Sequence, residues 1–398
     1  MIRLFINGLA ASAGAGLTYL RNVIPHLAQR KDVHATVLLS ADLRREFIDY
    51  PNISFAEVKR TRGVLERFLF EQTKLKSLLR SSGAQVLLST GNFALRNSPV
   101  PQILLSGNSL YVSDDFYRDV RKRGDYMLWS DTLIKGFFAK QSILWADVTL
   151  APSKAFADDL SKWTGKSVLS VYHGFDRELF TSDKTPLPAS ILHQLNDDQL
   201  NDSGDTLKLL FVSHYNYYRN FETLIRALPL LHDRLPKKKI KLFLTCDLSS
   251  QKNSGSYRAE AAASLADEIG VRDSIVELGA VPYHLLHHLY RGCQIYVSPA
   301  YAETFAHPLV EAMSSALPVV ASDLPVHREI CQDAAIYFSR FSPESIVEQI
   351  LKIHESPELA EKLSRNGLRR AQDFSWSAHV ESLVTLAHEL LEQGHEHN

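Results

Sequence analysis

The chain has 398 residues, of which 45% are hydrophobic and 22% charged, and its formal net charge is −1. This length suits two domains of about 100–200 residues each, with enough apolar residues for two cores. The near-zero charge gives no argument for a nucleic-acid or acidic partner. Three scattered cysteines predict a reducing compartment, and hence a cytoplasmic protein without a disulfide framework. No apolar run approaches the ~18 residues that would span a bilayer.

The first half of the chain alternates predicted strands and helices. Residues 2–6 are a short apolar run, and a glycine-containing turn leads from it into a helix. Further strand-like runs lie at residues 35–39, 86–89, 102–105 and 145–152, with a helix at 64–79. This alternation predicts an α/β fold, with a parallel sheet covered by helices on both faces.

Gly14 and Gly16 stand in the first of these turns. A strand, a glycine-containing loop and a helix are the opening of a Rossmann-like unit, in which glycines let a ligand approach the backbone. The spacing does not match the G-x-G-x-x-G fingerprint. A tight turn that packs the helix on the strand is therefore the alternative.

Two segments combine basic and aromatic residues. The first holds Lys59, Arg60, Arg62, Arg67, Lys74, Lys76 and Arg80; the second is residues 118–123, followed by Tyr126, Met127, Trp129, Phe137 and Phe138. This composition suits docking on an anionic membrane or binding a lipid-phosphate acceptor. The alternative is that both segments are solvated helix faces over ordinary core aromatics.

Residues 181–206 are rich in Asp, Asn, Ser and Pro and show little apolar periodicity, so they predict an exposed linker. The predicted domains are residues 1–180 and 207–376, followed by a C-terminal helix at 377–398. The second domain opens with a strand at 207–213, a loop that carries His214 and Arg219, and a helix at 221–231. Arg219 offers a bidentate fork to an anion, whereas His214 helps only when protonated.

A second loop carries two spaced carboxylates. Residues 294–298 form a strand-like run, Glu303 lies in the following loop, and Pro308 marks the first turn of a helix that holds Glu311. Such a junction turns backbone N–H groups and a positive dipole end toward an anion. The two carboxylates could then hold a phosphorylated, hydroxyl-rich ligand.

This stretch resembles the C-terminal signature of the retaining glycosyltransferases of family 4, in glycosyltransferase group 1. Glu303 and Glu311 have the family's spacing, and Ser322, Asp323, Pro325 and Glu329 fit its SD-x-P-x-x-x-E pattern. Thr304 and Ala306 stand where the family usually has glycines. The likeness covers nearly all of the chain and is most specific at residues 279–338.

Two further motifs carry the resemblance. Gly174, Asp176 and Phe180 match the family's NG-x-D-x-x-x-F turn, with His173 in place of Asn. Arg219 and the following Asn match its Lys-Asn pair, with Arg for Lys. The family fold is GT-B, α/β with two Rossmann-like domains facing a central cleft. The resemblance assigns acceptor binding to the first domain and nucleotide-sugar binding to the second, and predicts that the last helix crosses back to the first domain.

The resemblance also implies roles for individual residues. Glu303 would hold sugar hydroxyls, Glu311 the ribose hydroxyls and Arg219 the diphosphate. Asn108 stands near a family histidine and would position the sugar, since an amide cannot carry a proton at neutral pH. Gly14 and Gly16 would line the cleft. The other donor-binding residues implied are Ser213, His214, Gly279, Val281, Pro282, Thr304, Phe305, Ala306, His307 and Leu309.

The implied activity is retaining transfer of a sugar from a UDP- or GDP-sugar to a hydroxyl of a glycan or lipid-linked acceptor, in cell-surface polysaccharide or glycoconjugate synthesis. No cofactor or metal is expected, because the chain has no Asp-x-Asp motif. His284, His287 and His288 are expected to be structural. A peripheral contact with the inner face of the membrane is a further expectation. A nucleotide-sugar epimerase, a sugar-phosphate phosphorylase and a catalytically inactive sugar-nucleotide or glycan-binding protein are the alternatives, and turnover of a donor separates the last from an enzyme.

Overall fold

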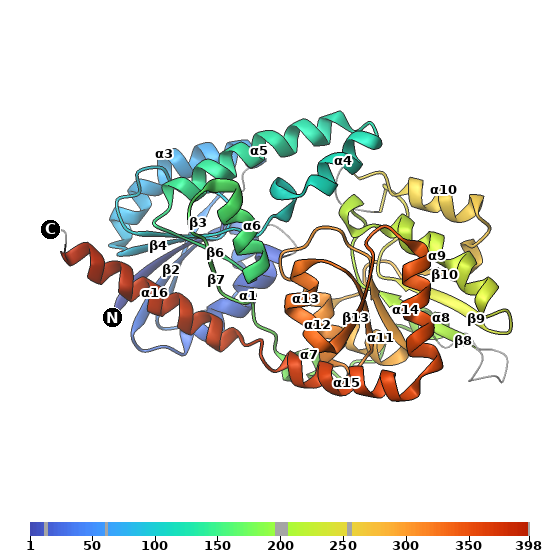
Figure 1. Cartoon of the computed structure of the whole chain (residues 1–398). Coiled ribbons are helices and arrows are strands. Elements are labelled where there is room, and N and C mark those ends of the chain that lie inside the picture. The colour runs from blue at the N-terminus through green and yellow to red at the C-terminus, as the bar shows by residue number, and fades with distance from the viewer. Residues whose placement is uncertain (12–14, 60–62, 196–205, 253–256, 397–398) are drawn as a thin grey trace. The chain divides into compact units, whose positions relative to one another are not determined.

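A computed structural model describes residues 1–11, 15–59, 63–195, 206–252 and 257–396. The chain divides into two compact units, and each is described by itself. The first unit consists of Met1–Val112, Ser130–Gly174 and Ser375–Asn398, and the second of Ser113–Trp129 and Phe175–Phe374. Each unit is built on one parallel sheet (Figure 1), which confirms the predicted α/β fold.

The first unit has a seven-stranded sheet in the order β3-β2-β1-β4-β5-β6-β7. Its strands are β1 (Ile2–Asn7), β2 (Val33–Ser40), β3 (Ile53–Val58), β4 (Val86–Ser89), β5 (Gln102–Leu105), β6 (Val148–Ala151) and β7 (Leu169–Ser170). Its helices are α1 (Ala15–Ala28), α2 (Ala41–Arg44), α3 (Val64–Ser82), most of α5 (Tyr126–Trp145), α6 (Lys154–Thr164) and α16 (Trp376–Glu396).

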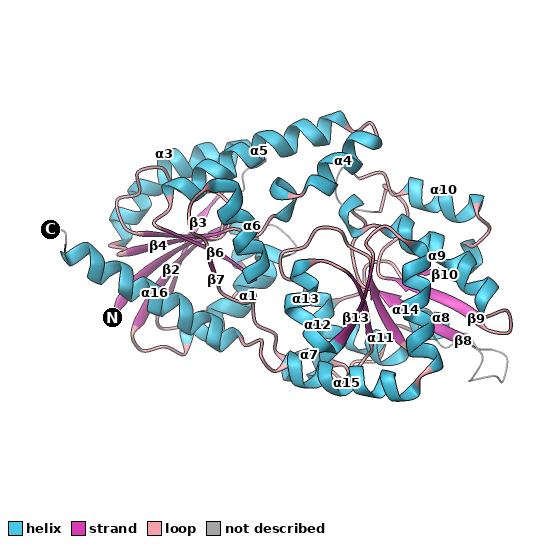
Figure 2. Cartoon of the chain, viewed as in Figure 1, coloured by secondary structure: helices cyan, strands magenta, loops and turns pink. Residues whose placement is uncertain are grey.

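Alternation along β1 divides the first core between the two faces of the sheet. Leu4 and Ile6 pack in one cluster with α1 and α16, whereas Phe5 points to the other face and packs with Leu75 and Leu79 of α3. Helices therefore cover both faces, as Figure 2 shows in cyan around the magenta strands.

The C-terminal helix returns to the first unit, as predicted. Val380 and Leu383 of α16 join the core cluster that contains Leu20 and Val23 of α1. At the start of this helix the chain passes very close to Gly174, where a Cβ atom would lie only 2.0 Å from the backbone nitrogen of Trp376. The match of Gly174 to the family motif thus has a steric reason.

The second unit has a six-stranded sheet in the order β10-β9-β8-β11-β12-β13. Its strands are β8 (Thr206–Phe211), β9 (Lys239–Leu244), β10 (Ile275–Glu277), β11 (Ile295–Ser298), β12 (Val319–Ser322) and β13 (Ala335–Phe338). Its helices are α4 (Asp114–Lys122), α7 (Arg177–Ser182), α8 (Ala189–Leu195), α9 (Phe221–Arg234), α10 (Glu260–Glu268), α11 (Leu286–Gly292), α12 (His307–Ser314), α13 (Pro325–Cys331), α14 (Pro343–Glu355) and α15 (Pro357–Ala371).

The structure differs from the predicted domain organisation at two places. Residues 113–129 group with the second unit, although they lie within the predicted first domain. The predicted linker contains α8, whose Ile191 and Leu195 are buried, so this part is a packed helix and not an exposed linker. Leu195 packs against Gly292, and two buried positions four residues apart are too short a pattern to predict a helix.

Candidate functional site

The strand order of the second sheet reverses between β8 and β11, its two central neighbours. In an open parallel sheet, ligands bind outside the carboxyl ends of the strands at such a switch point. The loop after β8 leads to α9 and carries Arg219, and the loop after β11 leads to α12 and carries Glu303. The topology therefore brings together the two loops that were predicted to bind the donor.

Arg219 and Glu303 form an ion pair across these two loops. The Glu303 side chain is only 8% exposed and that of Arg219 is 21% exposed. The guanidinium also lies over the ring of Tyr218, with its carbon 5.1 Å from the ring centre. The pair uses Nη1 of Arg219, and its Nε has no hydrogen-bond partner in the described part of the chain. Arg219 can thus hold the carboxylate and still offer N–H donors to an anion.

Asn220 fixes the end of the Arg219 loop. Its backbone is left-handed (φ 58°), a conformation that Asn tolerates better than most residues. The side-chain amide donates to the carbonyl oxygens of Pro299 (3.0 Å) and Arg340 (2.8 Å), and its oxygen accepts from the hydroxyl of Thr223 (2.7 Å). Asn220 thereby joins the loops that follow β8, β11 and β13.

The start of α12 offers fewer N–H groups to an anion than an ordinary helix start. Pro308 has none, and the amide of Leu309 donates to the carbonyl oxygen of Ala306 (2.9 Å). The backbone of Ala306 is left-handed (φ 65°), which explains why a glycine would suit this position. Phe305 is buried and its ring contacts that of His307 (4.8 Å between centres). Burial lowers the pKa of His307 to about 4, so its imidazole is uncharged at neutral pH.

Glu311 lies on the buried side of α12 and is 4% exposed. The hydroxyl of Tyr290 on α11 donates to its Oε2 (2.7 Å). Burial raises the pKa of Glu311 to about 7, although this hydrogen bond works in the opposite direction. Glu311 is therefore a carboxyl group whose charge changes near neutral pH, and the buried Tyr290 is a partner that the sequence pattern did not reveal.

The other predicted donor-binding residues are spread over three loops of the second unit. Ser213 follows β8, and its amide donates to Oγ1 of Thr245 (3.0 Å), while His214 is exposed beside it. Thr304 is half-buried, and its amide donates to Oε2 of Glu303 (3.3 Å). Gly279, Val281 and Pro282 lie in the turn after β10, where Gly279 has φ 68° and Pro282 is exposed.

The remaining predicted residues belong to the first unit. Asn108 follows β5, and its Oδ1 accepts from the amide of Leu110 (3.1 Å) while the side chain also hydrogen-bonds Tyr111. Gly16 lies near the start of α1, where an added Cβ would lie 3.3 Å from Cα of Ala11. This close approach agrees with the alternative that the glycine serves a tight turn. Gly14 lies outside the described residues.

A buried carboxylate that the sequence pattern missed lies at the switch point of the first sheet, between β1 and β4. Glu71 of α3 accepts from Nδ2 of Asn7, the last residue of β1 (3.0 Å), and pairs with Nε of Arg67 (3.6 Å). Burial raises the pKa of Glu71. Its position in a helix with basic neighbours gave no signal that it faces inward.

His327 of α13 is a second group that the sequence pattern missed. It is fully buried, and its Nδ1 donates to the carbonyl oxygen of Ser322 (2.9 Å). Burial lowers its pKa to about 4, and the nearby charge of Arg219 contributes in the same direction. An uncharged imidazole therefore lies close to the Arg219–Glu303 pair.

The histidines of the 284–288 region have backbone partners. Nδ1 of His287 donates to the carbonyl oxygen of His284 (2.9 Å), and Nε2 of His288 to that of Thr185 (3.0 Å). Within the described ranges, no group of three or more His, Cys, Asp or Glu side chains could hold a metal ion. The same residues include no helix long and apolar enough to cross a membrane.

Two solved structures have a similar fold. Sucrose-phosphate synthase from Thermosynechococcus elongatus superposes with a TM-score of 0.75 at 17% identity, over 99% of this chain and all of that one. Anabaena HepE in complex with UDP gives 0.68 at 16% identity, over 98% and 100% of the two chains. The fold is GT-B.

A family model matches part of the second unit. Residues 194–370 match the model of the glycosyl transferases group 1. The D-inositol 3-phosphate glycosyltransferase of Thermomonospora curvata is 25% identical over 182 residues, which are 45% of this chain and 42% of the relative. The chain spans less than half the length of the curated relatives it matches. Over residues 194–370 the chain is thus similar to the glycosyl transferases group 1.

Proposed function

We propose that this protein is a retaining glycosyltransferase of family 4 that moves a sugar from a nucleotide-sugar donor, a UDP- or GDP-sugar, to a hydroxyl of a glycan or lipid-linked acceptor. The observation that carries the proposal is the Arg219–Glu303 ion pair at the switch point of the second sheet, with Glu311 buried in the helix that follows. These three residues supply a cation for a diphosphate and two carboxylates for sugar hydroxyls.

The chemistry can be assigned to atoms of these residues. The glycosidic C–O bond breaks and its electron pair stays on the nucleoside diphosphate, which gains charge. The N–H donors that Arg219 does not use toward Glu303 stabilise that charge through charge-assisted hydrogen bonds. The acceptor oxygen forms the new bond on the same face of the sugar, and its proton passes to the departing phosphate. No metal takes part in this scheme.

Turnover with and without metal tests the proposal. UDP-glucose, UDP-N-acetylglucosamine and GDP-mannose are incubated with the protein in EDTA, and release of the nucleoside diphosphate is measured. We expect release from one donor and a loss of about 100-fold in Arg219→Met, since a donor aimed at developing charge contributes at this level. Arg226→Met, an exposed position on α9, is the matched control and keeps full activity.

Three results would count against parts of the scheme. Equal release by Arg219→Met would remove Arg219 from the site, and a requirement for added divalent metal would contradict the metal-free mechanism. Binding of a donor without any release would favour the alternative, a catalytically inactive sugar-nucleotide-binding protein. That alternative depends on Thr304 and Ala306 in place of the family's glycines and on Asn108 in place of the family's histidine.

We further propose that an exposed apolar face on α3 and α5 contacts an anionic bilayer at the cytoplasmic face of the membrane, which would give access to a lipid-linked acceptor. Of the fifteen large hydrophobic residues that are exposed in the described part of the chain, nine lie on α3 and α5. They are Val64, Leu65, Leu69, Tyr126, Met127, Leu133, Ile134, Phe137 and Leu144. The rings of Phe68 and Phe138 pack between the two helices at 5.0 Å.

Charge favours a lipid surface as the partner of this apolar face. Tyr126, Leu133, Phe137 and Leu144 follow one another at helical spacing along α5, as Leu65 and Leu69 do on α3. Lys76 and Arg80 continue the row on α3. An apolar face with adjoining basic side chains suits anionic headgroups. Arg60 and Arg62 of the predicted basic segment lie outside the described residues.

Vesicle flotation tests whether this apolar face binds anionic lipid. The protein is mixed with phosphatidylglycerol-containing or pure phosphatidylcholine vesicles, and we expect binding to the former that weakens with salt. Ile134→Ser with Phe137→Ser should abolish it, whereas Ile48→Ser, at another exposed position, should not. Binding that survives the double substitution would contradict the proposal, as would a dimer in sedimentation that the same substitutions dissociate.

A further inference from the structure

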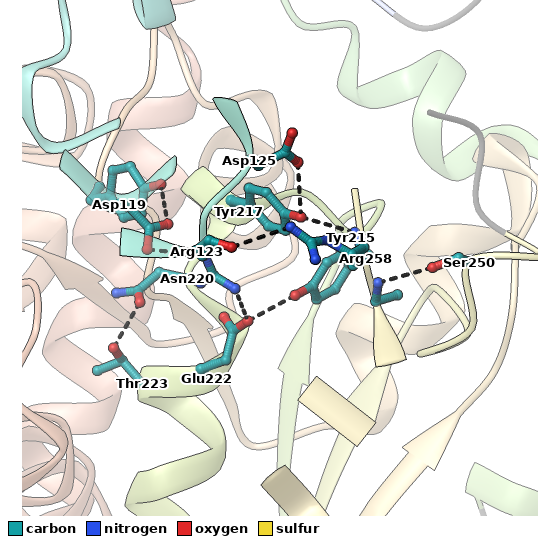
Figure 3. A network of polar contacts seen from close by, with 12 residues as sticks. Asp119, Arg123, Asp125, Tyr215, Tyr217, Asn220, Glu222, Thr223, Ser250 and Arg258 are labelled. Atoms are coloured by element: carbon teal, nitrogen blue, oxygen red, sulfur yellow. Dashed lines mark hydrogen bonds and ion pairs between the residues drawn. The ribbon is translucent and has the colours of Figure 1, made fainter. Parts of the chain in front are cut away.

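Residues 113–129 leave the first sheet, form α4 and dock within the second unit before the chain returns along α5. Ser113 caps α4, because its Oγ accepts from the amide of Phe116 (3.2 Å). The side chains of this segment enter a network of polar contacts with the loops of the candidate donor site (Figure 3).

Arg123 lies at the centre of the network. Its Nη1 donates to Oε1 of Glu222 (2.8 Å) and its Nε to Oδ1 of Asp119 (2.9 Å). The guanidinium carbon lies 4.3 Å from the centre of the Tyr217 ring. The hydroxyl of Tyr215 donates to the same oxygen of Glu222 (2.7 Å). Arg123 thus touches two residues that border or belong to the Arg219 loop, Glu222 and Tyr217, as the labelled side chains in Figure 3 show.

The same segment contacts the Glu303 loop through Asp119 and the loop that follows β13 through Asp115. Oδ2 of Asp119 accepts from the hydroxyl of Tyr301 (2.7 Å), two residues before Glu303. Oδ2 of Asp115 pairs with Nη1 of Arg340 (2.8 Å), whose carbonyl oxygen accepts from Asn220. Every loop that Asn220 joins is therefore also held from this segment.

The contacts are partly buried, so removing one partner costs more free energy than it would at a surface ion pair. The side chains of Arg123, Asp119 and Glu222 are 21%, 19% and 16% exposed. Pairs at such positions are poorly screened, and loss of one partner leaves the other charge unpaired in a dry environment. The nearby carboxylates outweigh burial and raise the pKa of Arg123, so it stays charged.

We propose that Arg123 is a positioning residue for Arg219 and Glu303, and that residues 113–129 hold the two donor loops in the geometry that a diphosphate requires. This inference rests on the proposed function. Arg219 lies in a loop between a strand and a helix, so its geometry depends on such supports. Loops that are already ordered in the free protein do not have to be ordered when the ligand binds, so binding avoids the entropy cost of ordering them.

The test compares nucleoside mono- and diphosphates. UDP, GDP and ADP are titrated calorimetrically into the wild type, and the one that binds is compared with its monophosphate. The Kd of the monophosphate divided by the Kd of the diphosphate isolates the contribution of the second phosphate. We expect Arg123→Met to reduce this ratio about 10-fold, since a catalytic contact misplaced by an ångström can lose up to 10². Arg123→Lys keeps the positive charge but lacks the guanidinium fork. Its Kd ratio should lie between that of the wild type and that of Arg123→Met.

Two further variants keep the test independent of folding. Tyr301→Phe removes only the hydroxyl that holds Asp119, and should reduce the ratio about threefold, the value of one ordinary hydrogen bond. Tyr337→Phe and Arg328→Met are controls in the same unit, because they remove a tyrosine hydrogen bond to the carbonyl oxygen of Gln332 and an arginine ion pair with Asp323, both outside the two loops. A structural defect lowers the fraction of protein that binds and leaves the ratio unchanged.

The outcomes separate this inference from the proposed function. If the wild type binds no nucleoside diphosphate, the proposed function fails and the inference with it. If the wild type binds one and the ratio stays the same in Arg123→Met and Tyr301→Phe, the positioning role is wrong while the donor site stands. An equal fall of the ratio in the two control variants would also overturn the positioning role.

Discussion

Glu311 combines burial with a titration near neutral pH. Its pKa is raised from 4.5 to about 7 because the folded chain removes the carboxylate from water. A raised pKa means that the folded state binds the proton more tightly than the unfolded state. The corresponding stability is fully present below pH 4.5 and is lost as the pH rises through about 7.

Glu311→Gln should therefore stabilise the protein at pH 8 and have little effect at pH 4. An amide avoids the cost of burying a carboxylate, and its oxygen can still accept from Tyr290. The shift corresponds to ~3 kcal/mol at pH 8. Urea unfolding at both pH values measures the difference. A variant that is equally destabilised at pH 4 and pH 8 would show that burial is not the cause of the shift.

Ala306 carries backbone strain at the start of α12. A left-handed conformation costs a non-glycine residue about 1–2 kcal/mol. Glycine removes this strain, and the greater conformational entropy of glycine in the unfolded chain cancels only part of the gain in stability. Ala306→Gly should thus stabilise the protein by about 0.5–1 kcal/mol in urea unfolding. Ala302→Gly, in the same loop but without a positive φ, should destabilise it. Equal effects of the two substitutions would rule out relief of strain.

The residues of the candidate site were only partly predictable from the sequence. Glu303 was named from its place in a loop between a strand and a helix and from the family resemblance, and Arg219 from the resemblance. Tyr290, His327 and Arg123 could not, because their importance comes from partners that are distant in the sequence: Glu311 is 21 residues from Tyr290, and Glu222 is 99 from Arg123.

The elements were predicted best where their apolar pattern was strong. The runs at 86–89 and 102–105 coincide with β4 and β5, and the helix at 64–79 is α3, which continues to Ser82. The edge strand β3 (Ile53–Val58) was missed because only part of it is buried, so its pattern is weak. The docking of α4 in the second unit was missed because its many charged residues resemble a solvated helix face.

Gly174 and the start of α16 form a contact between elements that tolerates no side chain. A Cβ at position 174 would overlap the backbone of Trp376, which cannot rotate away as a flexible side chain can. Gly174→Ala should cost about 3 kcal/mol or more and lower the melting temperature. Gly107→Ala, where no atom lies within 4 Å of the new Cβ, is the control and should leave the temperature unchanged. A melting temperature equal to that of the control would contradict this close contact.

At the scale of the whole molecule, we expect the nucleotide to be recognised by residues of the second unit alone. Arg219, Glu303 and Glu311 all belong to that unit, and so does the segment that supports their loops. The sequence assigned nucleotide binding to the second domain and acceptor binding to the first only through the family resemblance. Asn108 and Glu71 of the first unit are then expected to affect the acceptor, and not the affinity for a free nucleotide.

The most direct measurement is calorimetric binding of UDP, GDP and ADP in EDTA to the wild type, Arg219→Met, Glu311→Ala and the control Arg226→Met. We predict that one diphosphate binds to the wild type and the control, and that both site variants lose about 10-fold or more in affinity, the value of a charge-assisted contact. Absence of binding to the wild type, or equal binding by all four proteins, would contradict the assignment of the donor site.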